Sequence, residues 1–482
     1  MRWRTGTPES AGISSRALLK WVEALDQYEH VHSFMLIRNG IEAASGWWAP
    51  FDPHTPHLLF SLSKSFISCA AGFAIAEKRF ALSTPVLEIF PEYRKFITDS
   101  RFEQMTIRHL LTMSTGHGVC STAFFKLVPD GDLVRDFFTS PLEYAPGERF
   151  VYNSGATFML SAALRRTTGE NPSRYLRPRM LDALDIGERF WEKSPDGTDF
   201  GGWGYRLTTE EIASFALMLL EQGRVNGVRI LPEDYFQESV RQQISTETPA
   251  NANADWRQGY GYQFWRCRHN AFRADGACGQ YALVMPEQNM VLAVTAGGRN
   301  MQQILDTVWD ILLPGVAAAP LPEDPENRQR LSEKLAGLAL PVLHGEAPRK
   351  KKELIIELAS NQESLTHIAI ALHPESCTLT FKRSGMPDEV IRAGWEKPLA
   401  GETALEDHEN RPVSATAKLC GSTLQVRCIF FSTPFISDYR FTFEGNHVRL
   451  NRKRNLSFRY SPLEDFEGTL ILPDGKNSNE IH

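Results

Sequence analysis

The chain has 482 residues, a length that predicts two or three domains with a core large enough to hold a buried site. It is 42% hydrophobic and 23% charged, with a formal net charge of -6. This balance gives no electrostatic reason to expect nucleic acid as a partner. The basic cluster at residues 349–352 is interpreted as a solvated loop rather than a polyanion site.

Targeting signals and cofactor motifs are not evident in the sequence. The N-terminus is positively charged but lacks the apolar run of a secretory signal, and residues 66–76 are about half as long as a membrane-spanning helix. The seven cysteines are scattered, which is typical of reduced thiols in a cytoplasmic protein. His54 and His57 lack nearby carboxylate or thiol partners, so no metal is expected. We therefore expect a cytoplasmic protein without cofactor, nucleic-acid partner or membrane contact; its oligomeric state stays open.

The first 315 residues begin and end with predicted strands and are mostly helical between them. The pattern predicts a helix over 14–28, a hairpin with strands at 31–37 and 41–48, helices at 106–112, 156–166 and 209–222, and strands at 259–266 and 282–295. Thr208 or Thr209 can cap the helix over 209–222, with Glu210 or Glu211 in its first turn. This order predicts an α+β domain in which the terminal strands share one antiparallel sheet, flanked by helices.

The composition changes after residue 315. Residues 314–325 contain four prolines, and a short helical pattern follows at 328–338. Short strands are then predicted at 353–358, 366–372, 377–382, 423–431, 439–444 and 447–451. We therefore expect an α+β domain over 1–315, a linker with a short helix over 316–352, and an all-β barrel or sandwich over 353–482.

The strongest candidate for chemistry is the pair Ser61 and Lys64. The residues after Ser61 form a helical apolar stripe, so Lys64 lies one turn later on the same face. A buried lysine loses much of its preference for the charged form and can deprotonate a neighbouring hydroxyl. A capping serine with a surface lysine is the alternative, but the apolar flanks disfavour a solvated Lys64.

Three segments in order resemble a known family. Phe-Ser-Leu-Ser-Lys-Ser-Phe at 60–66, Pro-Gly-Glu-Arg-Phe-Val-Tyr-Asn-Ser at 146–154, and Ala-Asp-Gly-Ala at 274–277 are similar to the three motifs of the serine β-lactamase and penicillin-binding-protein superfamily, especially its class C branch. The resemblance covers roughly residues 7–313. It implies a helical cluster beside an antiparallel sheet, and a serine nucleophile that forms an acyl-enzyme.

The resemblance also implies roles for individual residues. Tyr152 matches the tyrosine that works with the lysine as general base and acid. Ser154 stands where an asparagine commonly holds the substrate amide, and Asn153 is the alternative if the turn is displaced by one residue. Gly276 matches the glycine that lets the strand approach the substrate, and the N–H groups of Ser61 and Ala277 correspond to the oxyanion hole.

The third motif lacks the family's lysine, which helps to bind a substrate carboxylate. Ala274 cannot replace that cation, and Asp275 would repel a carboxylate unless it is neutralised. We therefore expect an ester or amide substrate rather than efficient β-lactam hydrolysis. A D-amino-acid peptidase or amidase is the alternative enzyme, and a catalytically silent binding protein is the alternative from another class. Several tryptophans could line an acyl pocket, although core packing is the favoured role for most of them: Trp47, Trp48, Trp203 and those of the stretch 256–265.

Overall fold

The computed structural model describes residues 3–28, 30–248, 252–405, 409–457 and 463–471. The chain forms two compact units. The first comprises residues 1–47, 56–296 and 300–338, and the second comprises 48–55, 297–299 and 339–482. The expected domain limits at 315 and 353 stay predictions, and the last residues of the expected 353–482 domain, 472–482, lie outside the described residues.

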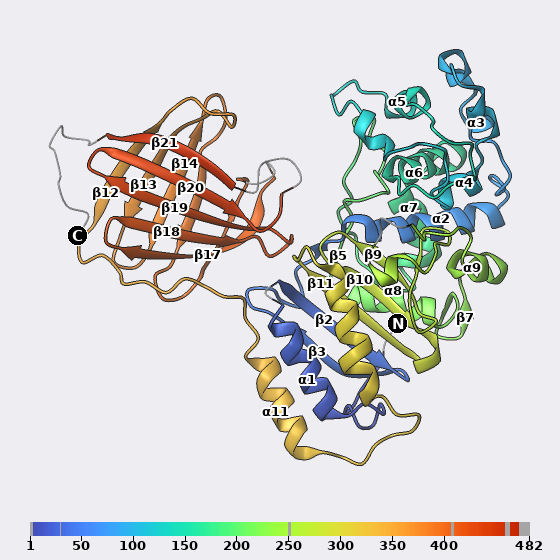
Figure 1. The fold of residues 1–482 in the computed structure, drawn as a ribbon, viewed down its shortest axis with the longest axis horizontal. Coiled ribbons are helices and arrows are strands. Elements are labelled where there is room, and N and C mark those ends of the chain that lie inside the picture. The colour runs from blue at the N-terminus through green and yellow to red at the C-terminus, as the bar shows by residue number, and fades with distance from the viewer. Residues whose placement is uncertain (1–2, 29, 249–251, 406–408, 458–462, 472–482) are drawn as a thin grey trace. The chain divides into compact units, whose positions relative to one another are not determined.

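A seven-stranded sheet forms the centre of the first unit (Figure 1). Its strands, in spatial order, are β1 (Arg4–Thr5), β3 (Ile41–Trp47), β2 (Val31–Arg38), β11 (Met290–Ala296), β10 (Gln280–Met285), β9 (Phe272–Gly276) and β8 (Trp265–Arg266). Strands β2 and β11 pair antiparallel at its middle, with Leu36 opposite Leu292. The predicted sharing of one sheet by strands from both ends of this region is confirmed.

Helices cover both faces of this sheet because successive side chains on a strand point in opposite directions. Phe34 of β2 packs edge-on against Trp21 of α1 (Ser15–Asp26), with ring centroids 5.0 Å apart. Its neighbour Ser33 hydrogen-bonds Thr209 of α8 (Thr209–Leu220) at 2.6 Å. Helix α11 (Pro325–Ala336) packs on α1 and β3, and α10 (Met301–Thr307) also contacts α1. The helix expected in the linker therefore lies in the first unit.

The remaining helices form a cluster around α2 (Ser63–Ala76), which is buried from Ser63 to Ala74. The cluster contains α3 (Val86–Ile89), α4 (Ile107–Leu111), α5 (Leu133–Thr139), α6 (Ser154–Thr168), α7 (Pro172–Leu176) and α9 (Glu233–Val240). Gly72 permits close packing, because a Cβ there would lie 2.6 Å from the ring of Tyr235 on α9. No helix among the described residues is both long and apolar enough to cross a membrane; the cytoplasmic location stays a prediction.

Two of the expected strands differ from the structure. Of the strand predicted over 259–266, only β8 at its end is formed, since Gly259 and Gln263 adopt positive φ angles of 97° and 62° and break the extended backbone. The segment 282–295 is a hairpin of β10 and β11 rather than one strand. Its turn contains Pro286 and Asn289, and Asn289 has a φ of 47°. Pro286 marks this turn in the sequence, directly after the strand that ends at Met285.

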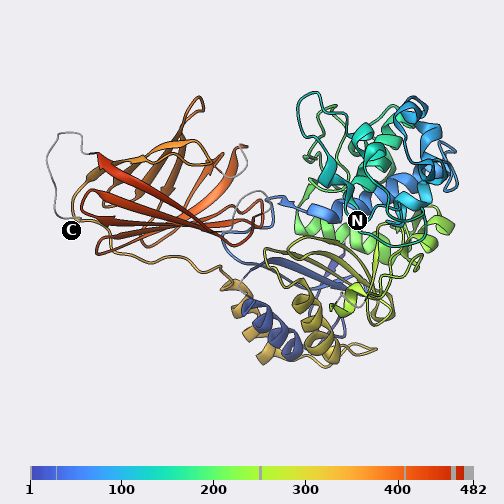
Figure 2. The same cartoon turned by 45° about the horizontal axis from the view of Figure 1, so that its top comes forward.

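The second unit is an antiparallel barrel of ten strands (Figure 2). In spatial order the strands are β15 (Glu389–Ala393), β14 (Cys377–Arg383), β13 (Leu365–Leu372), β12 (Lys352–Leu358), β21 (Leu463–Ile471), β20 (His447–Arg454), β19 (Ile436–Glu444), β18 (Thr423–Ile429), β17 (Arg411–Cys420) and β16 (Leu399–Thr403). The end strands β15 and β16 contact each other, and Gly394 bridges to Thr416, so the barrel is nearly closed. The predicted all-β architecture is confirmed.

Candidate active site

Ser61 lies in a short 3-10 turn, Phe60–Leu62, directly before α2. The preceding Phe60 has a positive φ of 47°, an uncommon conformation for a bulky residue. Two backbone contacts hold this turn. Leu59 N–H donates to the Tyr205 carbonyl at 2.9 Å, and Tyr205 N–H donates to the Ser63 hydroxyl at 3.3 Å. The half-buried Ser61 hydroxyl is thus presented from a fixed backbone.

Lys64 is only 1% exposed, and its ammonium nitrogen has three oxygen neighbours. Nζ lies 3.0 Å from Ser61 Oγ, 3.0 Å from Ser154 Oγ and 2.6 Å from the Gly202 carbonyl. Burial lowers the pKa of Lys64 to about 7, although the charges of Cys120 and Asp275 oppose this shift.

The same three contacts suit the neutral amine. The Gly202 carbonyl can only accept a hydrogen bond, and the Ser154 hydroxyl can accept one as well. A neutral Lys64 that donates to both retains one lone pair, which faces Ser61. Lys64 is therefore able to take the proton of the Ser61 hydroxyl.

Tyr152 is half-buried beside this pair. Its ring centroid is 5.0 Å from Lys64 Nζ, and the ring stacks on Trp265 with centroids 5.7 Å apart. Burial raises the pKa of the Tyr152 phenol and the Asp275 charge raises it further, whereas a hydrogen bond with Ser61 lowers it. A phenol with a raised pKa stays protonated near neutral pH, so in the resting protein Lys64 is the stronger candidate for base and Tyr152 for proton donor.

The neighbouring residues Asn153 and Ser154 point to different places. Asn153 is fully buried and caps α6: its Oδ1 accepts from Gly155 N at 3.0 Å and from Ser121 Oγ at 2.8 Å, and its Nδ2 donates to Thr115 Oγ1 at 3.2 Å. Ser154 begins α6 and directs its hydroxyl to Lys64. Of the two candidates for the family's asparagine position, Ser154 contacts the Ser–Lys pair.

Gly276 ends β9, which packs against the turn that carries Ser61. A Cβ at Gly276 would lie 2.0 Å from the Leu59 carbonyl, so this approach of two backbones requires glycine. The half-buried Ala277 starts the tight turn to β10, in which Cys278 and Gly279 have φ angles of 72° and 98°. The structure thus brings the third sequence motif to the nucleophile.

Asp275 is neutralised by an arginine, Arg273, that lies outside the three sequence motifs. Arg273 Nε lies 2.9 Å from Asp275 Oδ2, and both side chains are almost fully buried. Burial raises the pKa of Asp275 and Arg273 opposes that rise. The guanidinium also lies 4.2 Å from the ring centroid of Trp256 and 5.5 Å from that of Trp265. Trp265 therefore contacts both Arg273 of the ion pair and the ring of Tyr152. Ala274, between the two charged residues, is buried.

Two further groups contact the site. Gly202 belongs to the Gly-Gly-Trp-Gly-Tyr segment at 201–205, and a Cβ there would lie 3.0 Å from the Ser154 carbonyl. Cys120 accepts from Ser154 N at 3.3 Å; burial alone would raise the pKa of its thiol, but hydrogen bonds from Thr122 and the start of α6 hold it below its usual value. The glycine-rich segment was the available signal for Gly202, whereas nothing in the sequence marked Cys120.

The described residues contain no group of three or more His, Cys, Asp or Glu side chains that could hold a metal ion. His57 instead lies against His32, with Nε2 and Nδ1 3.1 Å apart.

Comparison with known proteins agrees with this geometry. The family model described as Beta-lactamase matches residues 25–307. The chain belongs to the beta-lactamase family. It is 31% identical to esterase EstB of Burkholderia gladioli over 136 residues, which cover 25% of this chain and 34% of the esterase. It is 25% identical to the 6-aminohexanoate-dimer hydrolase of Paenarthrobacter ureafaciens over 219 residues, 42% of this chain and 56% of the hydrolase.

The matches thus span about a third to a little over half of the lengths of these curated relatives. Among solved structures, EstCE1, a hydrolase with promiscuous acyltransferase activity, superposes with a TM-score of 0.50 at 17% identity, covering 61% of this chain and 99% of its own. At that identity the likeness concerns the fold. Together with the esterase and amide-hydrolase relatives, membership of the beta-lactamase family supports a serine hydrolase in general terms.

Proposed function

We propose that this protein cleaves a small ester or amide through an acyl-enzyme on Ser61. The observation that carries the proposal is the buried Lys64 amine, 3.0 Å from the Ser61 hydroxyl and with a pKa lowered to about 7. A neutral amine at hydrogen-bond distance activates a serine without a histidine.

The proposed reaction has two steps. Lys64 takes the proton of Ser61 as Oγ attacks the substrate carbonyl, and the N–H groups of Ser61 and Ala277 stabilise the oxyanion. The tetrahedral intermediate then expels its alcohol or amine, which receives a proton from Tyr152, and Lys64 reprotonates Tyr152. Water attacks the acyl-enzyme with the same groups in reversed roles, and Ser61 is released.

The decisive test is Ser61→Ala. Purified variant should lose turnover of a small nitrophenyl ester, and a fluorescent serine-directed phosphonate should label the unchanged protein but not the variant. Undiminished hydrolysis by pure Ser61→Ala protein would refute the assignment. If the unchanged protein neither hydrolysed the ester nor reacted with the phosphonate, a catalytically silent binding protein would be the better interpretation.

We further propose that the substrate lacks a carboxylate at the position where the family's lysine binds one. Position 274 is a buried alanine, which offers no cation, and the Asp275 carboxyl forms an ion pair with Arg273. The relatives include an esterase and a 6-aminohexanoate-dimer hydrolase, which supports an ester or amide as the substrate. Rates on a nitrophenyl ester, D-amino acid amides and a chromogenic cephalosporin would separate the candidates: we expect the ester to be fastest and the cephalosporin slowest. A preference for D-amino acid amides would instead favour the peptidase or amidase.

A further inference from the structure

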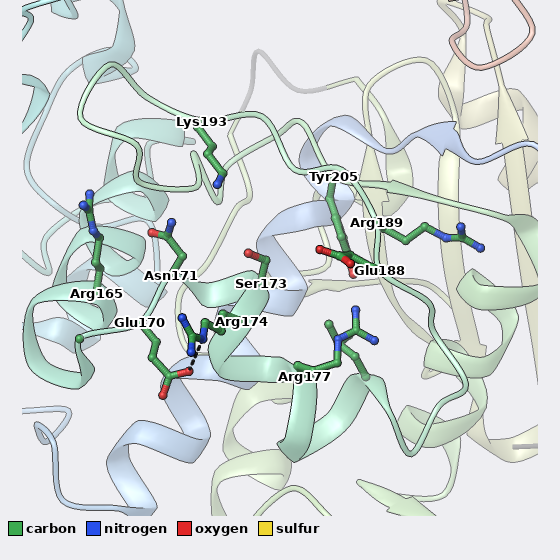
Figure 3. Close-up of a pocket in the computed structure, with 12 residues that line it drawn as sticks. Arg165, Glu170, Asn171, Ser173, Arg174, Arg177, Glu188, Arg189, Lys193 and Tyr205 are labelled. Carbon is green, nitrogen blue, oxygen red and sulfur yellow. Dashed lines mark ion pairs between the residues drawn. The ribbon is translucent and has the colours of Figure 1, made fainter.

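A cavity in the first unit is lined in part by Tyr205, the last residue of the 201–205 segment, and lies apart from the cluster of Ser61, Lys64 and Tyr152. It has a volume of about 700 Å³ and includes no residue of that cluster in its lining. Figure 3 shows Lys193 reaching toward it from above, Arg174 and Arg177 from below, and Ser173 and Tyr205 between them.

Basic side chains dominate its lining. Four arginines and one lysine line the cavity against two carboxylates, Glu170 and Glu188. Arg189 is held by the nearly buried Glu211, and in Figure 3 its guanidinium points away from the other lining side chains. Arg165 donates to the Asp196 carbonyl and to Thr198 Oγ1, and Arg177 donates to the carbonyls of Ile186 and Gly187. Arg174 and Lys193 are therefore the two cations most available to a ligand.

The ion pairs of these cations are weak competitors. Arg174 is 84% exposed and lies 3.8 Å from Glu170. The carboxylate partners of Arg165 and Arg177, Asp196 and Asp182, are each 58% exposed. Exposed pairs of this kind contribute little, because water screens them. Among the described residues, no carboxylate lies within ion-pair distance of the Lys193 ammonium, although its charge acts on the buried Asp199 carboxyl and lowers the pKa of that group against the effect of burial.

The cavity wall also contains polar atoms that lack partners. Tyr205 is 1% exposed, and its hydroxyl has no hydrogen-bond partner among the described residues. The same holds for Asn171 Oδ1, whose Nδ2 already donates to the Gly197 carbonyl at 2.9 Å. Buried polar groups without partners are rare, since each forfeits its bonds to water. A hydroxyl donor beside several cations fits a ligand oxygen that carries negative charge.

We propose that this cavity binds a small oxyanion, the phosphate or carboxylate group of a metabolite. Arg174 and Lys193 would bind its charged oxygens, Tyr205 would donate its hydroxyl, and Asn171 Oδ1 would accept from a hydroxyl of the ligand. The backbone of Tyr205 meanwhile holds Leu59 and Ser63 on either side of Ser61. The proposal does not depend on the chemistry assigned to Ser61.

Isothermal titration calorimetry of the full chain with inorganic phosphate and, separately, with succinate tests the proposal at low ionic strength. We expect saturable binding of at least one, and the tighter one identifies the ligand's charged group. Lys193→Gln should weaken it about ten-fold, the usual effect of losing one charge-assisted hydrogen bond. Tyr205→Phe, which keeps the ring and the backbone, should weaken it by a smaller factor.

Lys20→Gln is the matched control, because Lys20 is an exposed lysine on α1 and its loss removes the same charge elsewhere. Binding should be unchanged in this variant. The proposal is overturned if neither anion binds saturably at millimolar concentration, or if Lys193→Gln and Lys20→Gln bind equally well. The circular dichroism spectrum of each variant verifies its fold, and Lys193, being exposed, supplies a test that does not disturb the core.

Discussion

Replacing Lys64 by arginine separates the two properties that the site combines, a positive charge and the ability to lose it. Burial lowers the pKa of Lys64 from 10.5 to about 7, which corresponds to about 5 kcal/mol in favour of the neutral amine and to a neutral population at neutral pH about a thousand-fold larger than in water. Arginine keeps the charge but is not deprotonated in proteins. We therefore expect Lys64→Arg to lower kcat/KM about a thousand-fold, within the range for a lost general base.

The assay is hydrolysis of a nitrophenyl ester by both proteins from mildly acidic to mildly alkaline pH. Because the neutral amine is the active form, kcat/KM of the unchanged enzyme should rise with pH, with a midpoint at about 7, and then level off. The residual rate of Lys64→Arg should lack this midpoint. Lys20→Arg, at an exposed position on α1, should keep both rate and midpoint. A Lys64→Arg variant with undiminished rate, or an unchanged enzyme whose rate falls as pH rises across neutrality, would refute the reasoning.

The burial of Lys64, the cap formed by Asn153 and the close packing at Gly276 each predict a further measurable outcome. The pKa of Lys64 is about 7 in the folded protein and 10.5 in the unfolded chain, so between these pH values the unfolded chain binds more protons. As the pH rises through this window, the free energy of unfolding of the unchanged protein should therefore increase by about 1.4 kcal/mol per pH unit relative to that of Lys64→Met. Denaturant titrations at several pH values measure this, and parallel pH dependences would contradict it. Asn153→Ala removes the cap of α6 and leaves buried donors such as Ser121 N–H unpaired, so it should cost about 2–4 kcal/mol of unfolding free energy; a loss within measurement error would contradict the buried cap. Gly276→Ala places a Cβ 2.0 Å from the Leu59 carbonyl. It should strongly reduce kcat and only slightly reduce the melting temperature. An equally active variant would show that the two backbones are not held this closely.

The parts of the site that follow local rules could be predicted from the sequence. Ser61 and Lys64 are three residues apart on one helical turn, and their spacing alone brings the two side chains together. Arg273 and Asp275 could have been paired in the same way, since alternate residues of a strand share a face. The contacts of Gly202 and Cys120 could not, because both reach Lys64 or Ser154 from loops distant in sequence.

The fold shows the same division. Alternating apolar residues identified β12, β13 and β14, whereas the strand expected over 259–266 failed at backbone angles that apolar patterning does not reveal. Strand β21 was not predicted because three acidic residues, Glu464, Asp465 and Glu467, lie around its buried Phe466. Its two neighbours in the barrel, β12 and β20, decide its conformation.

The pairing of β2 with β11 has a consequence for synthesis of the protein. Ser61 and Lys64 leave the ribosome early, but β9, which packs against their turn, and β11, which pairs with β2, are made only near the end of the first unit. Until then, one edge of β2 is unpaired, and the strand that ends at Gly276 has not yet been made to pack beside Ser61. A nascent chain therefore carries Ser61 and Lys64 long before β9 can pack against them, and the unpaired edge of β2 is open to pairing with another chain until β11 is made.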